Sequence, residues 1–355
     1  MLDLFEIKAN DKKIYDEQLD RFLPQNIIDI HTHVWLDQLK AHAEGDFSRV
    51  VTWPSLVAKD NSIEDHVETY KLLFPGKRVV PLIFASVKPS DNIDKMNQYI
   101  AESAARYGYP SLIYSHPTWS GDDLERRIID GGFVGIKSYL NLTPDYLPRT
   151  EVRIYDFFPH HQLKIADKHK LLVMLHVPRD GRLGDKVNLA QLVEIDKTYP
   201  NATVIIAHVG RAYCPENVGD AFEILASTDN LLIDFSANTN ALVFERMIEA
   251  VGPKRILFGS DMPILRMRMR RICEDGLYIN VVPKGMYGDV SADKNMREVQ
   301  GREADALTFF MYEELLAFKS AAEKTGLSTE DLNDIFYKNS ARVLRTAGFD
   351  GLETD

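Results

Sequence analysis

Eight short apolar runs, rich in β-branched residues, recur along the chain, and the gaps between most of them carry helical patterns. The runs cover residues 27–34, 79–87, 111–116, 133–140, 171–177, 203–209, 231–236 and 255–260. Continuous apolar strands that alternate with helices are typical of a parallel sheet buried on both faces. Eight such units predict an α/β chain folded as a (β/α)8 TIM barrel, which 355 residues can accommodate.

An open doubly wound sheet is the alternative fold for this pattern. Its usual phosphate-binding signature, Gly-x-Gly-x-x-Gly after the first strand, is absent from the sequence, so we favour the barrel. No composition break, flexible linker or fixed-period repeat divides the chain. We therefore expect a single domain over residues 1–355, with a core over 26–344.

Two segments extend this plan towards the C-terminus. Residues 263–300 are too long for a simple connection after the eighth run, and we expect an extended loop that closes over the barrel mouth. The stretch 266–271 within it carries four arginines, for which an exposed helix face or a subunit contact is the favoured interpretation. Residues 303–324 and 328–346 are expected to form C-terminal helices, the second opened by the capping box Ser328-Thr-Glu-Asp331.

The charge and the cysteine content narrow the class of function. With 53 acidic and 42 basic side chains, the formal net charge of −11 opposes non-specific attraction to nucleic acid or anionic lipid and favours a small-molecule partner. No segment approaches the roughly 18 apolar residues of a membrane span, and the N-terminus lacks a basic stretch followed by an apolar one. Two cysteines are too few for a disulfide framework, so we expect a cytoplasmic protein in which Cys214 is a buried thiol.

Histidine or aspartate stands at the ends of four apolar runs. His31 and His33 lie two residues apart in the first run, so strand alternation points both imidazoles the same way. His176 and His208 end two later runs, and Asp261 follows the eighth. Because the C-terminal ends of parallel barrel strands meet at one face, we expect these side chains to converge. The ligand types suit Zn²⁺, with Mn²⁺, Fe²⁺ or Ni²⁺ feasible, whereas unrelated polar strand ends are the less favoured explanation.

These residues resemble the amidohydrolase superfamily, and in particular its amidohydrolase-related branch, also called amidohydrolase family 2. The segment Asp29-Ile-His-Thr-His33 matches the strand-one motif of that branch. Residues 259–263, Gly-Ser-Asp-Met-Pro, are similar to its strand-eight signature, and residues 335–344 are similar to its terminal helix. The resemblance spans nearly the whole chain and implies a metal-dependent TIM-barrel enzyme, without specifying a substrate.

The resemblance also implies roles for individual residues. A single divalent metal would be bound by His31, His33, His176 and Asp261. In that arrangement His208 stands just outside the metal ligands, and Asp261 and His208 are the catalytic groups that transfer protons.

Lys137, in the segment Gly135-Ile-Lys-Ser-Tyr139, leaves the number of metals open. Two-metal members of the superfamily place a carbamylated lysine or a glutamate at the end of strand four, and this lysine could be such a bridge. Many one-metal members look to have a lysine in a similar setting, where an ammonium would meet an anionic substrate. We favour the ammonium, because a desolvated cation at a barrel mouth is a natural partner for a carboxylate.

Further side chains near the strand ends are candidates for substrate binding. Arg179 and Arg211 each lie three residues beyond a strand-end histidine, where either could clamp a carboxylate or form a surface salt bridge. The aromatic residues Trp35, Tyr139 and Tyr213 could form a pocket wall, although barrel packing explains many aromatic residues at strand ends. Among the other histidines, His66 lies in polar surroundings and is expected at the surface.

Three functions are compatible with these features. The first is a hydrolase that uses a metal-activated water on a small, carboxylated amide, ester or lactone. The alternative is a non-oxidative, metal-dependent decarboxylase resembling aminocarboxymuconate-semialdehyde decarboxylase. The third, less favoured, is a barrel that binds a metabolite without turnover. The expected partner is a small anionic metabolite, with neither nucleic acid nor membrane, and the resemblance makes a homodimer plausible.

Overall fold

The eight strands of the barrel lie where the apolar runs predict them. The computed structural model describes residues 4–41 and 57–352. In chain order the strands are β1 (Asn26–His33), β2 (Arg78–Phe84), β3 (Leu112–Tyr114), β4 (Gly135–Lys137), β5 (Leu172–Leu175), β6 (Thr203–Ile206), β7 (Leu231–Asp234) and β8 (Ile256–Leu257). Each overlaps one predicted run, so the alternation of apolar strands with helices is confirmed.

Main-chain contacts close these strands into a ring. β1 pairs with β2, and β3 to β8 pair in chain order, all of them parallel. Ile83 of β2 forms a parallel bridge with Ser111, at the start of β3. On the other side, the N–H of Ile30 in β1 donates to the C=O of Phe258, just after β8, at 3.0 Å. The predicted barrel is therefore closed, and the C-terminal ends of all eight strands meet at one face.

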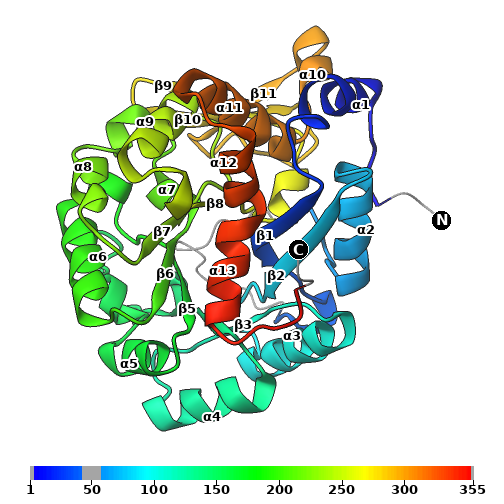
Figure 1. The fold of residues 1–355 in the computed structure, drawn as a ribbon. Coiled ribbons are helices and arrows are strands. Elements are labelled where there is room, and N and C mark those ends of the chain that lie inside the picture. Colours follow the sequence, from blue (N-terminus) through cyan, green and yellow to red (C-terminus); the bar gives the residue numbers. More distant parts are fainter. Residues whose placement is uncertain (1–3, 42–56, 353–355) are drawn as a thin grey trace.

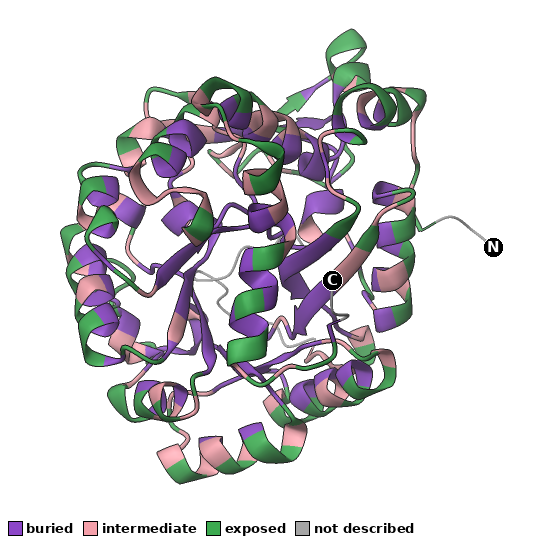
Figure 2. Ribbon diagram, viewed as in Figure 1, coloured by how far each residue is buried: buried purple, intermediate pink, exposed green. Residues whose placement is uncertain are grey.

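Helices surround the barrel, as Figure 1 shows. They are α1 (Ala9–Ile14), α2 (Ile63–Leu73), α3 (Ile93–Tyr107), α4 (Gly121–Gly131), α5 (His160–Lys168), α6 (Lys186–Thr198), α7 (His208–Arg211), α8 (Ala221–Ala226), α9 (Ala241–Val251), α10 (Arg302–Ala306), α11 (Phe310–Thr325), α12 (Thr329–Asn333) and α13 (Asn339–Thr346). The strands are buried, while the helices present exposed faces outward (Figure 2). Ser328 opens α12 by accepting the N–H of Asp331 at 3.1 Å, which confirms the predicted capping box.

The inside of the barrel is filled with apolar side chains. One buried cluster joins residues of many strands, namely Ile28, Ile30, Leu82, Phe84, Leu112, Leu172, Met174, Ile205, Leu232 and Leu257. Val343 and Leu344 of α13 belong to the same cluster. The side-chain amide of Asn339 donates to the C=O of Ile256 at 2.9 Å, at the start of β8. α13 therefore covers the end at which the strands begin, and the opposite end is left for chemistry.

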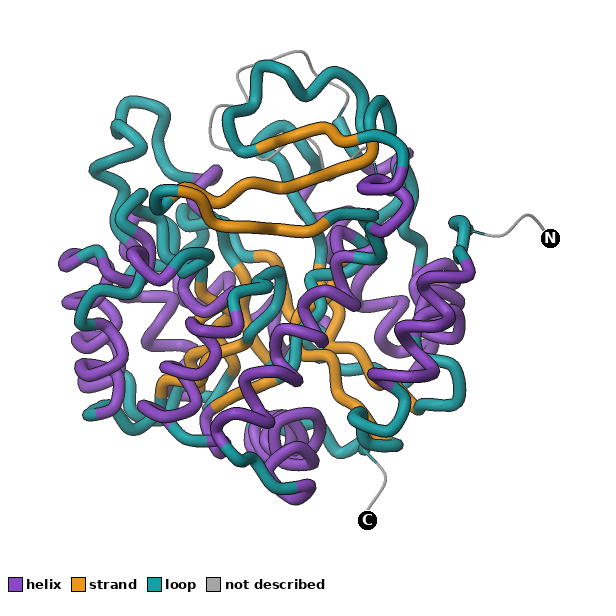
Figure 3. Tube along the Cα trace, turned by 90° about the horizontal axis from the view of Figure 1, so that it is seen from above, coloured by secondary structure: helices purple, strands orange, loops and turns teal. Residues whose placement is uncertain are grey.

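The segment after β8 contains a small sheet of its own. Its strands are β9 (Arg270–Glu274), β10 (Leu277–Pro283) and β11 (Met296–Val299). β10 pairs antiparallel with β9 and parallel with β11. Figure 3 shows this sheet across one end of the barrel. The segment after β8 is long, as predicted, but it folds into three strands where a loop was expected.

The arginine-rich stretch in this segment is mostly buried, so the expectation of an exposed helix face is wrong. Arg266, Arg268 and Arg271 are buried, and only Arg270 is exposed. The stretch forms a turn followed by β9, so alternate side chains point inward. Arg268 is compensated by Asp11, whose two carboxylate oxygens accept its Nη atoms at 2.7 and 2.8 Å.

The two cysteines are joined. Cys214 is fully buried, as expected, but it forms a disulfide with Cys273 of β9, so the prediction of a free thiol is wrong. The residues lie 59 positions apart, a pairing that only the fold reveals. Across residues 4–41 and 57–352, the helices are too short or too polar to cross a bilayer.

Candidate active site

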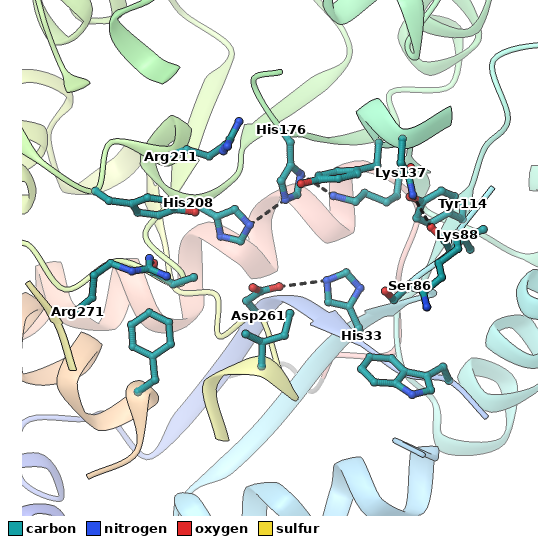
Figure 4. A pocket seen from close by; sticks show the side chains of 18 of the residues that line it. His33, Ser86, Lys88, Tyr114, Lys137, His176, His208, Arg211, Asp261 and Arg271 are labelled. Carbon is teal, nitrogen blue, oxygen red and sulfur yellow. Dashed lines mark hydrogen bonds and ion pairs between the residues drawn. The ribbon is translucent and has the colours of Figure 1, made fainter. Parts of the chain in front are cut away.

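A cavity of about 210 Å³ lies at the C-terminal ends of the barrel strands. The predicted site residues that line it are His33, Lys137, Tyr139, His176, His208, Arg211 and Asp261. Figure 4 shows the side chains of His33, Lys137, His176, His208 and Asp261 around a common space. Trp35 and Tyr213 also belong to the wall, so for these aromatic residues the pocket contact holds in addition to packing. Strand-end residues from distant parts of the chain are thus brought together.

The two histidines of β1 lie beside Asp261. His31 is fully buried, and its Nδ1 lies 2.9 Å from Oδ2 of Asp234. The Nε2 of His31 is 3.6 Å from Oδ1 of Asp261, and the Nε2 of His33 is 3.1 Å from the same oxygen. Burial alone would raise the pKa of Asp261, but His208 and His33 hold this pKa below its usual value. Asp261 is therefore a carboxylate.

His176 and His208 face each other across the cavity. Their Nε2 atoms are 2.8 Å apart, and Nδ1 of His208 is hydrogen-bonded to Oγ of Ser236 at 2.8 Å. Burial lowers the pKa of His208 to about 4 and the pKa of His176 well below its usual value. Both imidazoles are therefore neutral at pH 7, as metal ligands and hydrogen-bond acceptors must be.

Lys137 contacts His176 on the side opposite His208. Its Nζ lies 2.6 Å from Nδ1 of His176, and the side chain is buried. Burial lowers the pKa of Lys137 to about 7, against the opposing attraction of Asp261 and Asp234. At a pKa of about 7, Lys137 is partly an ammonium at neutral pH, and in that form it can bind an anionic substrate.

Two of these groups stand on unusual backbone. His208, Val209 and Arg211 have φ values of 58, 50 and 61°, and Asp261 has 52°, all in the left-handed region. A β-branched residue such as Val209 is disfavoured there by its own side chain. Such outliers persist where the surrounding structure holds them and often mark functional sites. The left-handed turn carries His208 from the end of β6 to the cavity.

The donor set fits a divalent metal ion. Two overlapping groups of candidate ligand atoms lie within 4.8 Å of one another, one from His31, His176 and His208 and one from His31, His33 and Asp261. His31 is common to both, and its buried Nε2 has no hydrogen-bond partner among the described residues. A buried imidazole nitrogen left without a partner suits a metal ligand. The geometry groups His208 with His31 and His176, so it does not separate His208 from the ligands implied by the resemblance.

The comparisons with known proteins agree with this arrangement. The family model described as Amidohydrolase matches residues 28–271, which is more than half of the chain. The chain belongs to the amidohydrolase family. This confirms the resemblance in the motifs and makes the protein an enzyme of a metal-dependent family. A search of curated proteins found no match to this amidohydrolase.

Solved structures of low identity share the barrel. An amidohydrolase from Burkholderia multivorans with bound Zn has a TM-score of 0.56 at 12% identity, over 90% of this chain and 99% of that one. A structure from Acinetobacter baumannii, named as a probable 2-pyrone-4,6-dicarboxylic acid hydrolase with citric acid bound, has a TM-score of 0.53 at 14% identity, over 90% of this chain and 99% of that one. A dihydroxybenzoic acid decarboxylase from Polaromonas with bound manganese has a TM-score of 0.54 at 14% identity, over 93% of this chain and 100% of that one. At these identities the likeness establishes the fold.

Three of the four predicted substrate-binding residues line the cavity, and one does not. Lys137, Tyr139 and Arg211 line the cavity of this amidohydrolase. Arg179 does not line it, and its Nε lies 3.4 Å from Oδ1 of Asp185 instead. Asp185 is the N-cap residue of α6, so the acidic partner that a helix start favours draws Arg179 away from the cavity.

Two buried aspartates were missed by the sequence reasoning. Asp234 accepts from His31 and also from the main-chain N–H of His208 at 2.9 Å. Asp29 accepts the N–H of Ser260 at 2.8 Å, and burial raises its pKa to about 7. Asp234 is the last residue of β7 and stands inside the predicted run 231–236, where it interrupts the apolar residues as His31 interrupts the first run. It could therefore have been found.

Proposed function

We propose that this amidohydrolase hydrolyses a small, carboxylated amide, ester or lactone, with zinc as its metal. The observation that supports this most is the position of ionised Asp261 within contact of two β1 imidazoles and in the same cavity as neutral His208. A proton acceptor, a hydrogen-bonding imidazole and a set of metal donors are the groups that hydrolysis by water requires.

The proton roles follow from the charges of these groups. Asp261 is ionised and can accept a proton from an attacking water. His208, oriented through Nδ1 by Ser236, can hydrogen-bond the carbonyl or the leaving group through Nε2. A divalent metal held by the donor set would polarise the scissile carbonyl and lower the pKa of water. Imidazoles with one carboxylate and an open position are the ligand set of catalytic zinc, and this favours zinc over manganese.

An anionic substrate is supported by the basic groups of the cavity. Lys137 and Arg211 line it, and both side chains are held within the protein rather than in bulk water. A charge in a partly desolvated site attracts a carboxylate more strongly than a surface charge does. The free amine of Lys137 is our proposal over the carbamate, because its Nζ is already in contact with His176.

Decarboxylation remains the second candidate. The donor set suits a carboxylate next to a metal as well as a carbonyl, and a decarboxylase is among the solved structures with the same fold. In that reaction the buried groups would deliver a proton to carbon rather than accept one from water.

Labelled solvent separates the two reactions. The zinc-loaded protein is screened against aryl lactones, amides and carboxylated phenols in water enriched in oxygen-18. Hydrolysis predicts one labelled oxygen in the product acid. Release of carbon dioxide with no label in the product would support the decarboxylase, and inactivity with tight metabolite binding would support a barrel without turnover.

A cytoplasmic location and a homodimer also stay predictions. The disulfide between Cys214 and Cys273 is unusual for a reducing compartment, so thiol titration of the protein from its native compartment tests the location. Light scattering after size exclusion gives the oligomeric state.

A further inference from the structure

Three arginines gather around two tyrosine rings on the His208 side of the cavity. The guanidinium carbons of Arg182 and Arg271 lie 4.9 and 4.2 Å from the ring centroid of Tyr213, and 4.7 and 5.0 Å from that of Tyr278. Arg182 also donates to the C=O of Arg211 at 3.0 Å. Within residues 4–41 and 57–352, none of these three arginines forms an ion pair with a carboxylate.

Arg271 is the most buried member of this cluster and still has a donor nitrogen without a partner among the described residues. It belongs to β9, lines the cavity and is only 8% exposed. Its Nε donates to Oδ1 of Asn280 at 2.8 Å, and its Nη1 donates to the C=O of Ala237. No hydrogen bond of Nη2 to a described residue is found. Aromatic rings cover the guanidinium, and Asn280 and Ala237 hold its Nε and Nη1, so Nη2 is the donor that is left for an oxyanion.

Arg211 lines the cavity from a different element. It lies on the left-handed turn after β6, and its Nη1 makes only long contacts, 3.3 and 3.4 Å, with the C=O groups of Val177 and Pro178. Figure 4 shows Arg211 and Arg271 on the same side of the cavity, away from Lys88 and Ser86. Arg271 is buried and Arg211 is half-buried, and guanidinium groups withdrawn from water without a counter-charge carry a desolvation penalty, which a bound anion would offset.

The disulfide ties this cluster together. Cys214 directly follows Tyr213, and Cys273 lies two residues after Arg271 on β9. The bond therefore anchors the strand that carries Arg271 to the loop that carries the stacking ring. This joins the segment after β8 to the cavity wall and restrains the strand that carries Arg271.

We propose that Arg271, together with Arg211, binds a second acidic group of the substrate, remote from the reacting centre. This rests on the proposed function, in which a first carboxylate lies near Lys137. Figure 4 shows Lys137 and Arg271 on opposite sides of Asp261, so the two cationic ends face a ligand from two directions. The cavity is small for a ligand site and is walled by Trp35, Tyr114 and Tyr139. The substrates are therefore small, planar, single-ring acids with two anionic groups.

Calorimetric titration of the zinc-loaded, full-length protein tests this without turnover. The probes are benzoate, with one carboxylate, and isophthalate and terephthalate, with two at different spacings. We expect one of the dicarboxylates to bind at least ~10-fold more tightly than benzoate, as charge-assisted hydrogen bonds predict. Arg271→Gln should abolish that preference and change the benzoate affinity less than about 2-fold, since a lost partner affects only the ligand that uses it. Arg271→Lys should restore part of the preference.

Arg270→Gln is the matched control, because Arg270 is the neighbouring residue on β9 but pairs with Glu313 at the surface. It should leave all affinities unchanged. Metal content and the unfolding midpoint establish that each variant is folded. If Arg271→Gln does not fold, the same titrations are carried out on Arg211→Gln. Equal binding of benzoate and dicarboxylates by the wild type, or binding of neither, would overturn the proposal. So would an equal loss for both ligand types in Arg271→Gln. Because turnover is not needed, a dicarboxylate preference can stand even if hydrolysis is not found.

Discussion

Nδ1 of His31 lies 2.9 Å from Oδ2 of Asp234, and both side chains are fully buried below the cavity. Burial alone would raise the pKa of Asp234, but its interaction with His31 holds that pKa below its usual value. Asp234 is therefore a carboxylate, and Nδ1 of His31 must donate to it. The tautomer that results leaves Nε2 with its lone pair facing the donor set.

Asp234→Asn should weaken zinc binding by about 10- to 100-fold, because the amide no longer imposes this tautomer on His31. Competition with a coloured chelator measures the affinity. Asp196→Asn is the matched control, since Asp196 is also buried and accepts the N–H of Asn230 at 2.8 Å, before the start of β7 and so at the opposite end of that strand from Asp234. Unchanged zinc affinity in Asp234→Asn would show that Asp234 does not orient a ligand.

Lys137→Met should lower kcat/KM for carboxylated substrates by about 10- to 100-fold, because it removes a buried charged hydrogen-bond donor. Lys137→Arg keeps the charge and should lose less. The same samples are measured by elemental analysis. A free amine predicts one metal per chain in both wild type and variant, whereas loss of a second equivalent in Lys137→Met would indicate the carbamate bridge.

His66 is fully buried, so the expectation of a surface position is wrong, and this residue should make the stability depend on pH. Burial, with a smaller contribution from Arg266, lowers its pKa from 6.5 to about 3 in the folded protein, so the unfolded chain binds the proton more tightly. The contribution of His66 to the free energy of unfolding is complete above pH 6.5 and decreases as the pH falls towards 3. Between pH 7 and pH 5 it decreases by about 2 kcal/mol. Thermal unfolding across this range measures it. His66→Gln should flatten that part of the profile, whereas His161→Gln, at an exposed position, should not; equal profiles for the two variants would contradict this assignment.

The disulfide between Cys214 and Cys273 should stabilise the fold by about 2–4 kcal/mol, because it closes a loop in the unfolded chain. Reductant should lower the denaturant midpoint of the wild type. It should have no effect on the double variant Cys214→Ala, Cys273→Ala, which serves as the control. Two titratable thiols in the native, unreduced protein would mean that the bond does not form.

Features repeated along the chain were predictable from the sequence. Each barrel strand is a local apolar run, and a polar residue at its end is visible without any knowledge of the fold. The barrel then places His31, His176 and Asp261 together, because parallel strands share one C-terminal face. Asp234 carried the same signal, but a single carboxylate at a strand end has no motif to attract attention.

Features that depend on distant partners were not predictable. The burial of Arg268 depends on Asp11, which lies 257 positions away. Its neighbour Arg271 becomes part of the cavity only because β9 pairs with β10 and is bonded to Cys214. The local sequence alone predicts that a run of arginines is exposed to solvent, because burying a charge requires a compensating group that the neighbouring residues do not supply.

The central claim is that strand-end donors around His31 hold a catalytic metal, and elemental analysis of the full-length protein tests it most directly. The wild type and His31→Ala are loaded with zinc, freed of excess metal and measured per chain, with circular dichroism to establish folding. We predict one equivalent in the wild type and only traces in folded His31→Ala. A full equivalent retained by His31→Ala would contradict the account.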